Sequence, residues 1–267
     1  MTDVPEAAKT LFEDSARLKV LETFKTGDGV TYHIVGSSDE EGGDPVLVRV
    51  DGGGNAEVTP EVKPEDQTTG GALSITSRAT EVLKAYRGEG QEQADDIAGG
   101  GTPLSQADLN SQFLKMAVKM AKDGFSSADA PGTDGGNLAC AWAVNQCASK
   151  ALGKQIGGGL ATANMVVVLR NKHNPTTKPI AGAVIISASA SVGGKWTIGH
   201  VGVLGKVDPA DEDKTLIYSN SSSEAKFMQN FTLGRWRTKY ATNKKLKVEF
   251  FELKPSLFPG ASDIEVG

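Results

Sequence analysis

The sequence predicts an α+β fold, and the order of its hydrophobic patterns is the reason. Residues 18–50 hold three short runs rich in β-branched and aromatic residues, which is typical of strands. Residues 106–172 carry apolar residues at helical spacing, and residues 180–254 return to strand-like runs. Helices followed by an antiparallel meander form an α+β layout, and no repeat of fixed period indicates another architecture.

The composition allows a packed core and argues against some partners. The chain has 267 residues, of which 39% are hydrophobic, so it can form one large domain or an ordinary domain with a small one. Its net charge of -5 argues against nucleic acid as the main partner, because such proteins usually carry a clustered basic patch. No run of about 18 apolar residues is present, so we expect no membrane span and no membrane partner.

The patterns divide the chain into four expected regions. Residues 1–14 form an acidic lead-in, and residues 15–51 form a small β-module with Gly and Asp at its turns. Residues 52–105 are rich in Gly, Pro, Thr and Glu, and are expected to be a linker that carries one helix over residues 75–87. Residues 106–267 form the large domain. The strands of the β-module are expected at residues 18–24, 30–36 and 45–52.

The large domain is expected to begin with helices and to continue with strands. Gly124 and Gly153 follow two of the helical patterns, where glycine commonly ends a helix. The helices are expected at residues 106–122, 138–152 and 159–172, with a further helix-like piece at 229–241. The strands are expected at residues 180–188, 195–205, 214–221 and 246–254.

The segment GGNLACAWAVNQC, residues 135–147, holds both cysteines of the chain. On one helix, Cys140 and Cys147 would lie ~10 Å apart along the axis, whereas a disulfide needs Cα atoms within about 7 Å. We therefore expect two reduced thiols. If Asn137 is the N-cap residue, Cys140 is the third helical residue, where free N–H groups and the helix dipole favour a thiolate. Cys147, two turns further on, is expected to be a small buried hydrophobe.

A thiolate nucleophile needs a base, and the chain has three histidines. His33 lies in an alternating strand pattern and His173 in a polar loop before a proline-marked turn. Both are expected to be solvated or satisfied by ordinary hydrogen bonds. His200 lies inside a strand-like apolar run, where histidine is out of character, so it is the expected base for Cys140.

Further motifs accompany the cysteine helix, namely PIAGAVIIS and IGHVGVLG, followed by LIYSNSS. Together with DGGNLACAW they resemble the papain-like cysteine hydrolases of the NlpC/P60 and CHAP type, over about residues 106–253. The resemblance implies a nucleophile helix, carrying Cys140, packed on an antiparallel sheet that carries His200 as general base. Two positions depart from the family's pattern. Ala139 stands where a polar residue usually precedes the nucleophile, and Ala183 stands where the strand motif usually has aspartate.

The family's third catalytic residue is polar and comes from the strand after the histidine strand. Asn220 is expected to take this role, because its amide oxygen can accept the Nδ1–H of His200 and fix the tautomer. Ser219 and Ser221 are the alternatives, since the parity of the strand cannot be set from the sequence. A simple polar turn is the other interpretation of this serine-rich stretch.

The resemblance also implies a mechanism and a substrate. Cys140 would attack an amide carbonyl while His200 transfers the proton, and water would release the acyl-enzyme. The backbone N–H of Cys140 could donate to the oxyanion. The implied substrate is bacterial peptidoglycan, cut at the N-acetylmuramoyl-L-alanine amide or within the stem peptide. The residues expected to line the groove are Trp142, Trp196 and Tyr218, although Trp142 also suits a core position.

Nothing in the sequence suggests a metal or another cofactor. No His/Cys spacing or carboxylate pair fits a metal site. The Gly-rich strings at residues 52–54, 99–101 and 157–159 lack the Lys-Ser/Thr continuation of a nucleotide phosphate loop.

The acidic N-terminal stretch lacks the continuous apolar core of a secretory signal. For a wall hydrolase this predicts synthesis in the cytoplasm and delivery by a phage particle, by lysis or by an injection device, with the β-module as a docking or targeting unit. Two alternatives stay open. One is a thiol acyl-transfer enzyme on a non-wall substrate, and the other is a non-enzymatic binding or structural module of a phage or injection particle.

Overall fold

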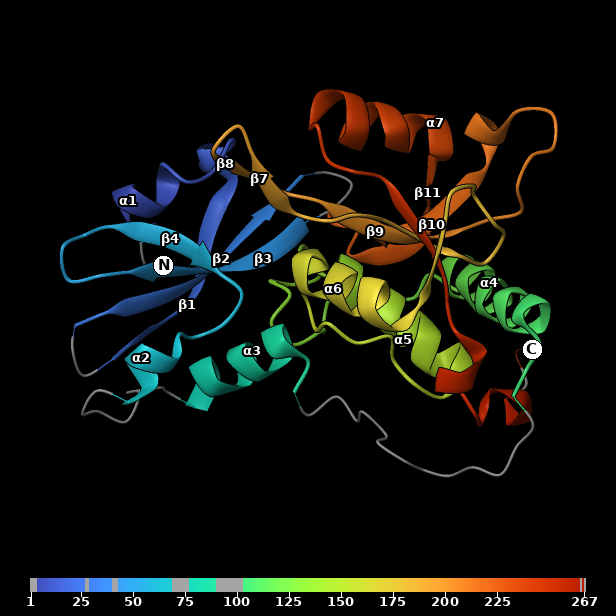
Figure 1. The fold of residues 1–267 in the computed structure, drawn as a ribbon, viewed down its shortest axis with the longest axis horizontal. Helices are drawn as coiled ribbons and strands as arrows, with labels where there is room; N and C mark the ends of the chain where they lie inside the picture. The colour runs from blue at the N-terminus through green and yellow to red at the C-terminus, as the bar shows by residue number, and fades with distance from the viewer. Residues whose placement is uncertain are drawn as a thin grey trace.

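The chain folds into a mixed α+β structure with antiparallel sheets, as the sequence predicts at this coarse level. The computed structural model describes residues 4–26, 29–39, 43–68, 77–89, 103–264 and 266. A four-stranded sheet lies on the left of Figure 1, and a larger unit built on a six-stranded sheet lies on the right. The expected Gly-rich string at residues 99–101 lies outside the described residues.

The N-terminal unit is a meander in which each strand pairs with the next one along the chain. Tyr32 and Ile34 face a core that includes α3, whereas Val35 faces a core that includes α1, so helices cover both faces of the sheet. The strands are β1 (Leu18–Lys25), β2 (Thr31–Ser38), β3 (Gly43–Val50) and β4 (Ala56–Thr59). The helices are α1 (Glu6–Lys9), η1 (Ser15–Arg17), α2 (Pro64–Thr68) and α3 (Ser77–Arg87).

The first three strands agree with the sequence prediction, but the expected linker does not remain free of the sheet. Its residues Ala56–Thr59 form β4, which pairs with β3. The expected lead-in also contributes to the core, because Ala8 and Phe12 are buried against the sheet. Long-range strand pairing forms β4, and long-range packing buries the lead-in residues. Neither interaction leaves a strong local pattern in the sequence.

The larger unit is a three-layer arrangement around the six-stranded sheet, whose order is β11-β10-β9-β6-β12-β5. Helices α4, α5 and α6 cover one face, and α7 with the π-helical turn η3 covers the other (Figure 1). The helices are α4 (Gln106–Lys122), α5 (Cys140–Leu152), α6 (Thr162–Lys172), α7 (Leu233–Trp236) and η3 (Arg237–Asn243), with short turns η2 (Glu212–Lys214), η4 (Pro255–Leu257) and η5 (Ala261–Asp263). The sheet strands are β5 (Asn174–Thr176), β6 (Val184–Ser187), β9 (His200–Leu204), β10 (Leu216–Ser221), β11 (Lys226–Thr232) and β12 (Glu249–Glu252).

The helix expected at residues 229–241 begins later in the structure than the sequence predicts. Residues 229–232 belong to β11, and the helix starts only at Leu233. Thr232 is the N-cap residue, and its side chain accepts a hydrogen bond from the backbone of Arg235. Gly153 ends α5 with φ +75°, as expected for a glycine that follows a helix.

The two units are tightly joined. A hairpin of β7 (Ala190–Val192) and β8 (Lys195–Thr197) extends from the larger unit to the N-terminal segment (Figure 1). There Trp196 donates its backbone N–H to Leu11 and accepts from Glu13. Ala161 of the larger unit belongs to the core of the N-terminal sheet. The sheet is therefore an integral part of the molecule, and it covers the beginning of α5.

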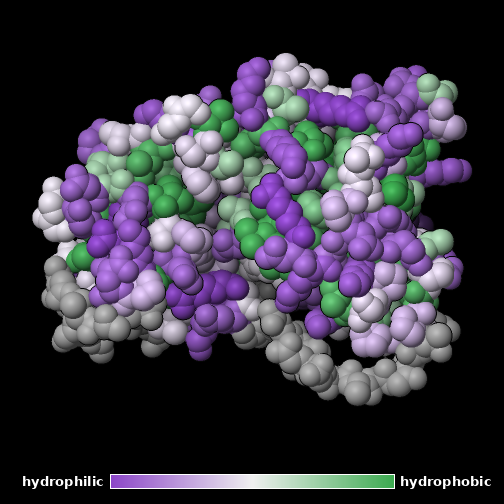
Figure 2. Space-filling model, viewed as in Figure 1, coloured by the Kyte–Doolittle hydropathy of each residue, from purple (hydrophilic) through white to green (hydrophobic). Residues whose placement is uncertain are grey.

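Hydrophilic and hydrophobic side chains are mixed on the face that Figure 2 shows, and no single hydrophobic patch dominates it. Among the described residues, no helix is both long enough and apolar enough to cross a membrane.

Candidate functional site

The expected nucleophile opens α5, but the helix begins later than the sequence predicts. Ala139 is the N-cap residue, and no side chain caps this end. Asn137, the expected cap, instead donates its side-chain N–H to Asp134 at 3.1 Å. Cys140 is therefore the first residue of the helix rather than the third. The reason is that residues 132–138 form turns with left-handed glycines at 132, 135 and 136, which hold Asn137 outside the helix.

The Cys140 thiol is sealed inside the molecule. Its side chain is 1% exposed, and its Sγ–H donates to the carbonyl oxygen of Gly43, at the start of β3, over 3.1 Å. Burial, with the nearby charge of Asp44, raises the pKa of Cys140 well above its ordinary value. The backbone N–H groups of Ala141 and Val201 act in the opposite direction but do not offset burial. The thiol is thus protonated at neutral pH and almost completely shielded from solvent.

Asp44 is the charged group that fixes β3 above the start of α5. Its carboxylate is completely buried and accepts the backbone N–H of Thr162 at 2.9 Å and the Thr162 hydroxyl at 2.6 Å. It also accepts the hydroxyl of Ser189. Burial raises the pKa of Asp44 from 3.8 to about 6, although these hydrogen bonds lower it. One carboxylate therefore joins the N-terminal sheet to two segments of the larger unit.

His200, the expected base, lies on the other side of the sheet. Its ring packs against Trp236 at 5.3 Å and Tyr240 at 5.9 Å between ring centres, in the layer that α7 and η3 cover. The ring is fully buried, and this burial lowers the pKa of His200 from 6.5 to about 3. His200 is therefore a neutral imidazole in an aromatic environment.

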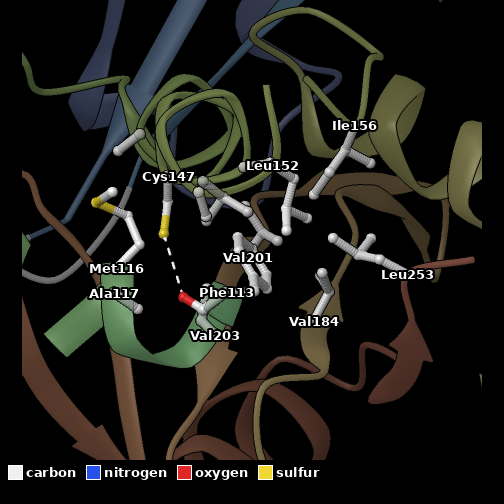
Figure 3. Close-up of a cluster of buried hydrophobic side chains, with 14 of the residues drawn as sticks. Phe113, Met116, Ala117, Cys147, Leu152, Ile156, Val184, Val201, Val203 and Leu253 are labelled. Atoms are coloured by element: carbon white, nitrogen blue, oxygen red, sulfur yellow. Dashed lines mark hydrogen bonds between the residues drawn. The ribbon is translucent and has the colours of Figure 1, made fainter. Parts of the chain in front are cut away.

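The alternation of side chains along β9 explains why Cys140 and His200 do not meet. Val201 and Val203 belong to the core under α4 and α5, as Figure 3 shows, and Cys140 belongs to the same core. Successive side chains of a strand point to opposite faces, so His200 points away from α5. The expected Cys140–His200 pair is wrong for this structure. The sequence could not show on which face of the sheet His200 lies, because β9 is buried on both faces and its apolar pattern does not distinguish them.

The expected third residue also lies elsewhere. Asn220 donates its side-chain N–H to the carbonyl oxygen of Gly136 at 3.0 Å and stands on the α5 side of the sheet, so it does not orient His200. Ser219, the first alternative, does contact His200, with Oγ 2.9 Å from Nε2. The Ser219 hydroxyl donates to Asn230 Oδ1 at 2.6 Å, so it accepts the Nε2–H of the imidazole.

The sequence analysis missed Asn230, because it lies on β11, within the stretch expected to be helical. The other ring nitrogen of His200, Nδ1, has no partner among the described residues. The remaining alternative, Ser221, hydrogen-bonds to Ser223 and not to the imidazole.

The three aromatic residues expected to line a groove are not brought together. Trp142 stacks on Phe125 at 5.7 Å and, like Tyr218, packs against the core that contains Cys140. Trp196 packs instead against the N-terminal sheet and lines a pocket of about 220 Å³ with Phe12. The substrate groove that these residues were expected to form is absent from the described structure.

Cys147, His33 and His173, which the sequence does not assign to catalysis, each form an ordinary hydrogen bond. Both cysteines are free thiols, as helix geometry predicts, and Cys147 is fully buried with its Sγ–H directed at the Phe113 carbonyl oxygen (Figure 3). His33 pairs with the Thr23 hydroxyl at 2.9 Å. His173 accepts the backbone N–H of Lys254 at 3.1 Å.

No protein-family model, no curated protein and no solved structure matches the chain. Within the described residues, no three His, Cys, Asp or Glu side chains gather closely enough to hold a metal ion.

Proposed function

We propose that this protein is a non-catalytic binding or structural module, and that its larger unit is a divergent papain-like core. The observation that supports this is the placement of Cys140 and His200 on opposite faces of one sheet. A cysteine hydrolase needs its nucleophile and base within hydrogen-bond reach. Bringing His200 to the α5 side would require a one-residue slip of β9, which would turn Val201 and Val203 out of the core.

The state of the thiol supports the same proposal. The reactive form of cysteine is the thiolate, and burial holds the pKa of Cys140 well above its ordinary value. The Gly43 carbonyl occupies the space in front of the sulfur. A substrate amide has no access to Cys140 while β3 remains in place.

The partner of such a module is proposed from the resemblance, which points to peptidoglycan. Purified protein is incubated with cell-wall sacculi, and the soluble fraction is analysed for muropeptides by mass spectrometry while the pellet is analysed for bound protein. We expect wild type and Cys140→Ala to bind sacculi equally and to release no fragments. Release of muropeptides by wild type that Cys140→Ala abolishes, and Cys147→Ala does not, would overturn the non-catalytic proposal.

A hydrolase is the second candidate, and one observation favours it. Cys140 stands at the first position of α5, and the N–H groups of Ala141 and Val201 are directed at its sulfur, which is the environment a thiolate or an oxyanion would use. This candidate requires β3 to withdraw and another group to accept the proton. The mass spectrum of the fragments would then identify the bond, either N-acetylmuramoyl-L-alanine or one within the stem peptide.

Alkylation separates the two candidates without any substrate. Iodoacetamide at neutral pH is expected to leave both cysteines of the native protein unmodified and to label both in urea. Rapid, selective labelling of Cys140 in the native protein would favour the hydrolase. Delivery by a phage particle, by lysis or by an injection device stays a prediction of the sequence, as does docking through the N-terminal sheet.

A further inference from the structure

A small cavity lies where α3 ends beside the connection between α5 and α6. Its volume is about 70 Å³, enough for a few water molecules or one small polyatomic group. Four segments of the chain converge on it. Its lining residues are Arg87, Gly88, Lys154, Gln155, Ile156, Gly157, Gly158, Lys172, His173, Leu257 and Phe258.

The lining is strongly positive. Among the described residues that line it, there are one arginine and two lysines but no carboxylate. Neither Lys154 nor Lys172 forms an ion pair in the part of the chain that the structure describes. Arg87 pairs only loosely with the exposed Glu89, at 3.4 Å. Three cations with so little internal compensation attract an anion to this position.

His173, another of the lining residues, supplies a neutral donor. Its Nδ1 accepts the backbone N–H of Lys254, so the proton of the neutral ring is on Nε2. Nε2 has no hydrogen-bond partner among the described residues, and it is not completely buried. Burial, with Lys172 and Lys254 nearby, lowers the pKa of His173 from 6.5 to about 4, which agrees with a positive local potential.

The lining residues also include apolar ones. Ile156 and Phe258 are buried, and Phe258 stacks on His173 with 6.1 Å between ring centres. Apolar walls exclude water and strengthen the attraction between the cations and an anion. Arginine and lysine together suit a phosphate, which offers several acceptor oxygens and up to two negative charges, better than a single carboxylate.

We propose that this cavity binds a phosphate group through Lys154, Lys172 and Arg87, with the Nε2–H of His173 as a further donor. The site differs from a nucleotide phosphate loop, which the sequence at residues 157–159 does not form. It lies apart from Cys140, and it does not depend on whether the protein is an enzyme.

The test is titration of the full chain with inorganic phosphate at constant ionic strength, measured by calorimetry and by NMR of the histidine rings. We expect saturable binding that shifts the His173 ring signals and leaves those of the fully buried His200 in place. A His173→Gln variant assigns the signal. Lys154→Ala and Lys172→Ala are each expected to weaken binding about tenfold or more, the loss of one charge-assisted hydrogen bond.

The matched control is Lys178→Ala, which removes an exposed lysine outside the cavity and is expected to bind as wild type does. Thermal melts confirm that each variant is folded. Binding that does not saturate, that is equal in all variants, or that leaves the His173 signals unmoved would overturn the proposal. Equal affinity for acetate would overturn the choice of phosphate. Tighter binding of O-phosphoserine than of inorganic phosphate would assign the group to a phosphate ester, and equal binding to the free ion.

Discussion

Asp44 gives this protein a pH dependence that a single substitution can isolate. The folded state holds the pKa of Asp44 at about 6, against an ordinary value of 3.8, because the carboxyl group is buried. A carboxyl group with a raised folded-state pKa stabilises the fold most when it is protonated in both states, below pH 3.8. That contribution is then lost as the pH rises through 6. At about 1.4 kcal/mol per pH unit, the pKa difference lowers the free energy of unfolding by about 3 kcal/mol in total.

The perturbation is Asp44→Asn, which keeps the shape of the side chain but cannot ionise. The free energy of unfolding is measured by urea denaturation at half-unit steps from pH 4 to pH 7.5 for both proteins. We expect wild type to lose up to about 3 kcal/mol relative to Asp44→Asn between pH 4 and pH 7. The comparison is essential, because His173 and His200 have lowered pKa values and titrate in the opposite sense over the same range.

Asp129→Asn, which removes an exposed carboxylate, controls for the loss of one negative charge. A difference between wild type and Asp44→Asn that stays constant from pH 4 to pH 7 would refute the reasoning. So would a relative gain of wild-type stability with rising pH, since that would mean the bonds from Thr162 and Ser189 outweigh the cost of burial.

Three further substitutions test separate parts of the structure. His200→Ala leaves a cavity among aromatic rings and is expected to lower the free energy of unfolding, measured by urea denaturation, by about 2–4 kcal/mol. A loss below about 1 kcal/mol would contradict the tight packing of the His200 ring. Asp66→Asn removes the carboxylate that accepts two hydrogen bonds from Arg49, at 2.7 and 3.1 Å, and is expected to lower the free energy of unfolding by about 2 kcal/mol. Unchanged thermal stability would show that the pair contributes nothing. Gly199→Ala would place a Cβ 1.9 Å from the backbone oxygen of Ser187, so a lowered melting temperature is expected, and an unaltered one would contradict this close approach.

The sequence predicts most of the elements of this fold, because their hydrophobic periods are strong and local. Helix α4 is an example: its apolar residues recur on one face, and the structure buries that face. Helix α5 ends at Gly153 as predicted, since only left-handed backbone lets the chain turn there. By contrast, β4 has four residues in a Gly-rich context, and only its pairing with β3 makes it a strand.

The candidate site was harder to predict, for a physical reason that concerns β9 and β10. Every residue of β9 is buried, so the apolar pattern is continuous and gives no parity. His200 therefore has two possible faces in any reading of the sequence. The same ambiguity applies to Ser219 and Asn220, which are neighbours in the chain and point to opposite faces. These polar residues are neighbours in the sequence, but the sheet places them on opposite faces.

The burial of Cys140 and the raised pKa of Asp44 are linked, and the link separates the two candidate functions. Withdrawal of β3 would expose both side chains together, because Gly43 covers the sulfur and the adjacent Asp44 holds the strand. In water the carboxyl group would regain its ordinary pKa, so opening becomes easier as the pH rises from 3.8 through 6. Over that range the open population should rise by up to about a hundredfold.

In a hydrolase that works through the open state, the open population must therefore rise with pH. Asp44→Asn must remove this rise but keep the pH dependence that comes from ionisation of the exposed thiol. A module that remains closed shows neither pH dependence. Alkylation of Cys140 measured against pH in wild type and in Asp44→Asn thus reports on opening itself. Ionisation of the free thiol alone raises the alkylation rate tenfold per pH unit below the thiol pKa. Only a steeper pH dependence in wild type, which disappears in Asp44→Asn, therefore supports a site that β3 opens and closes.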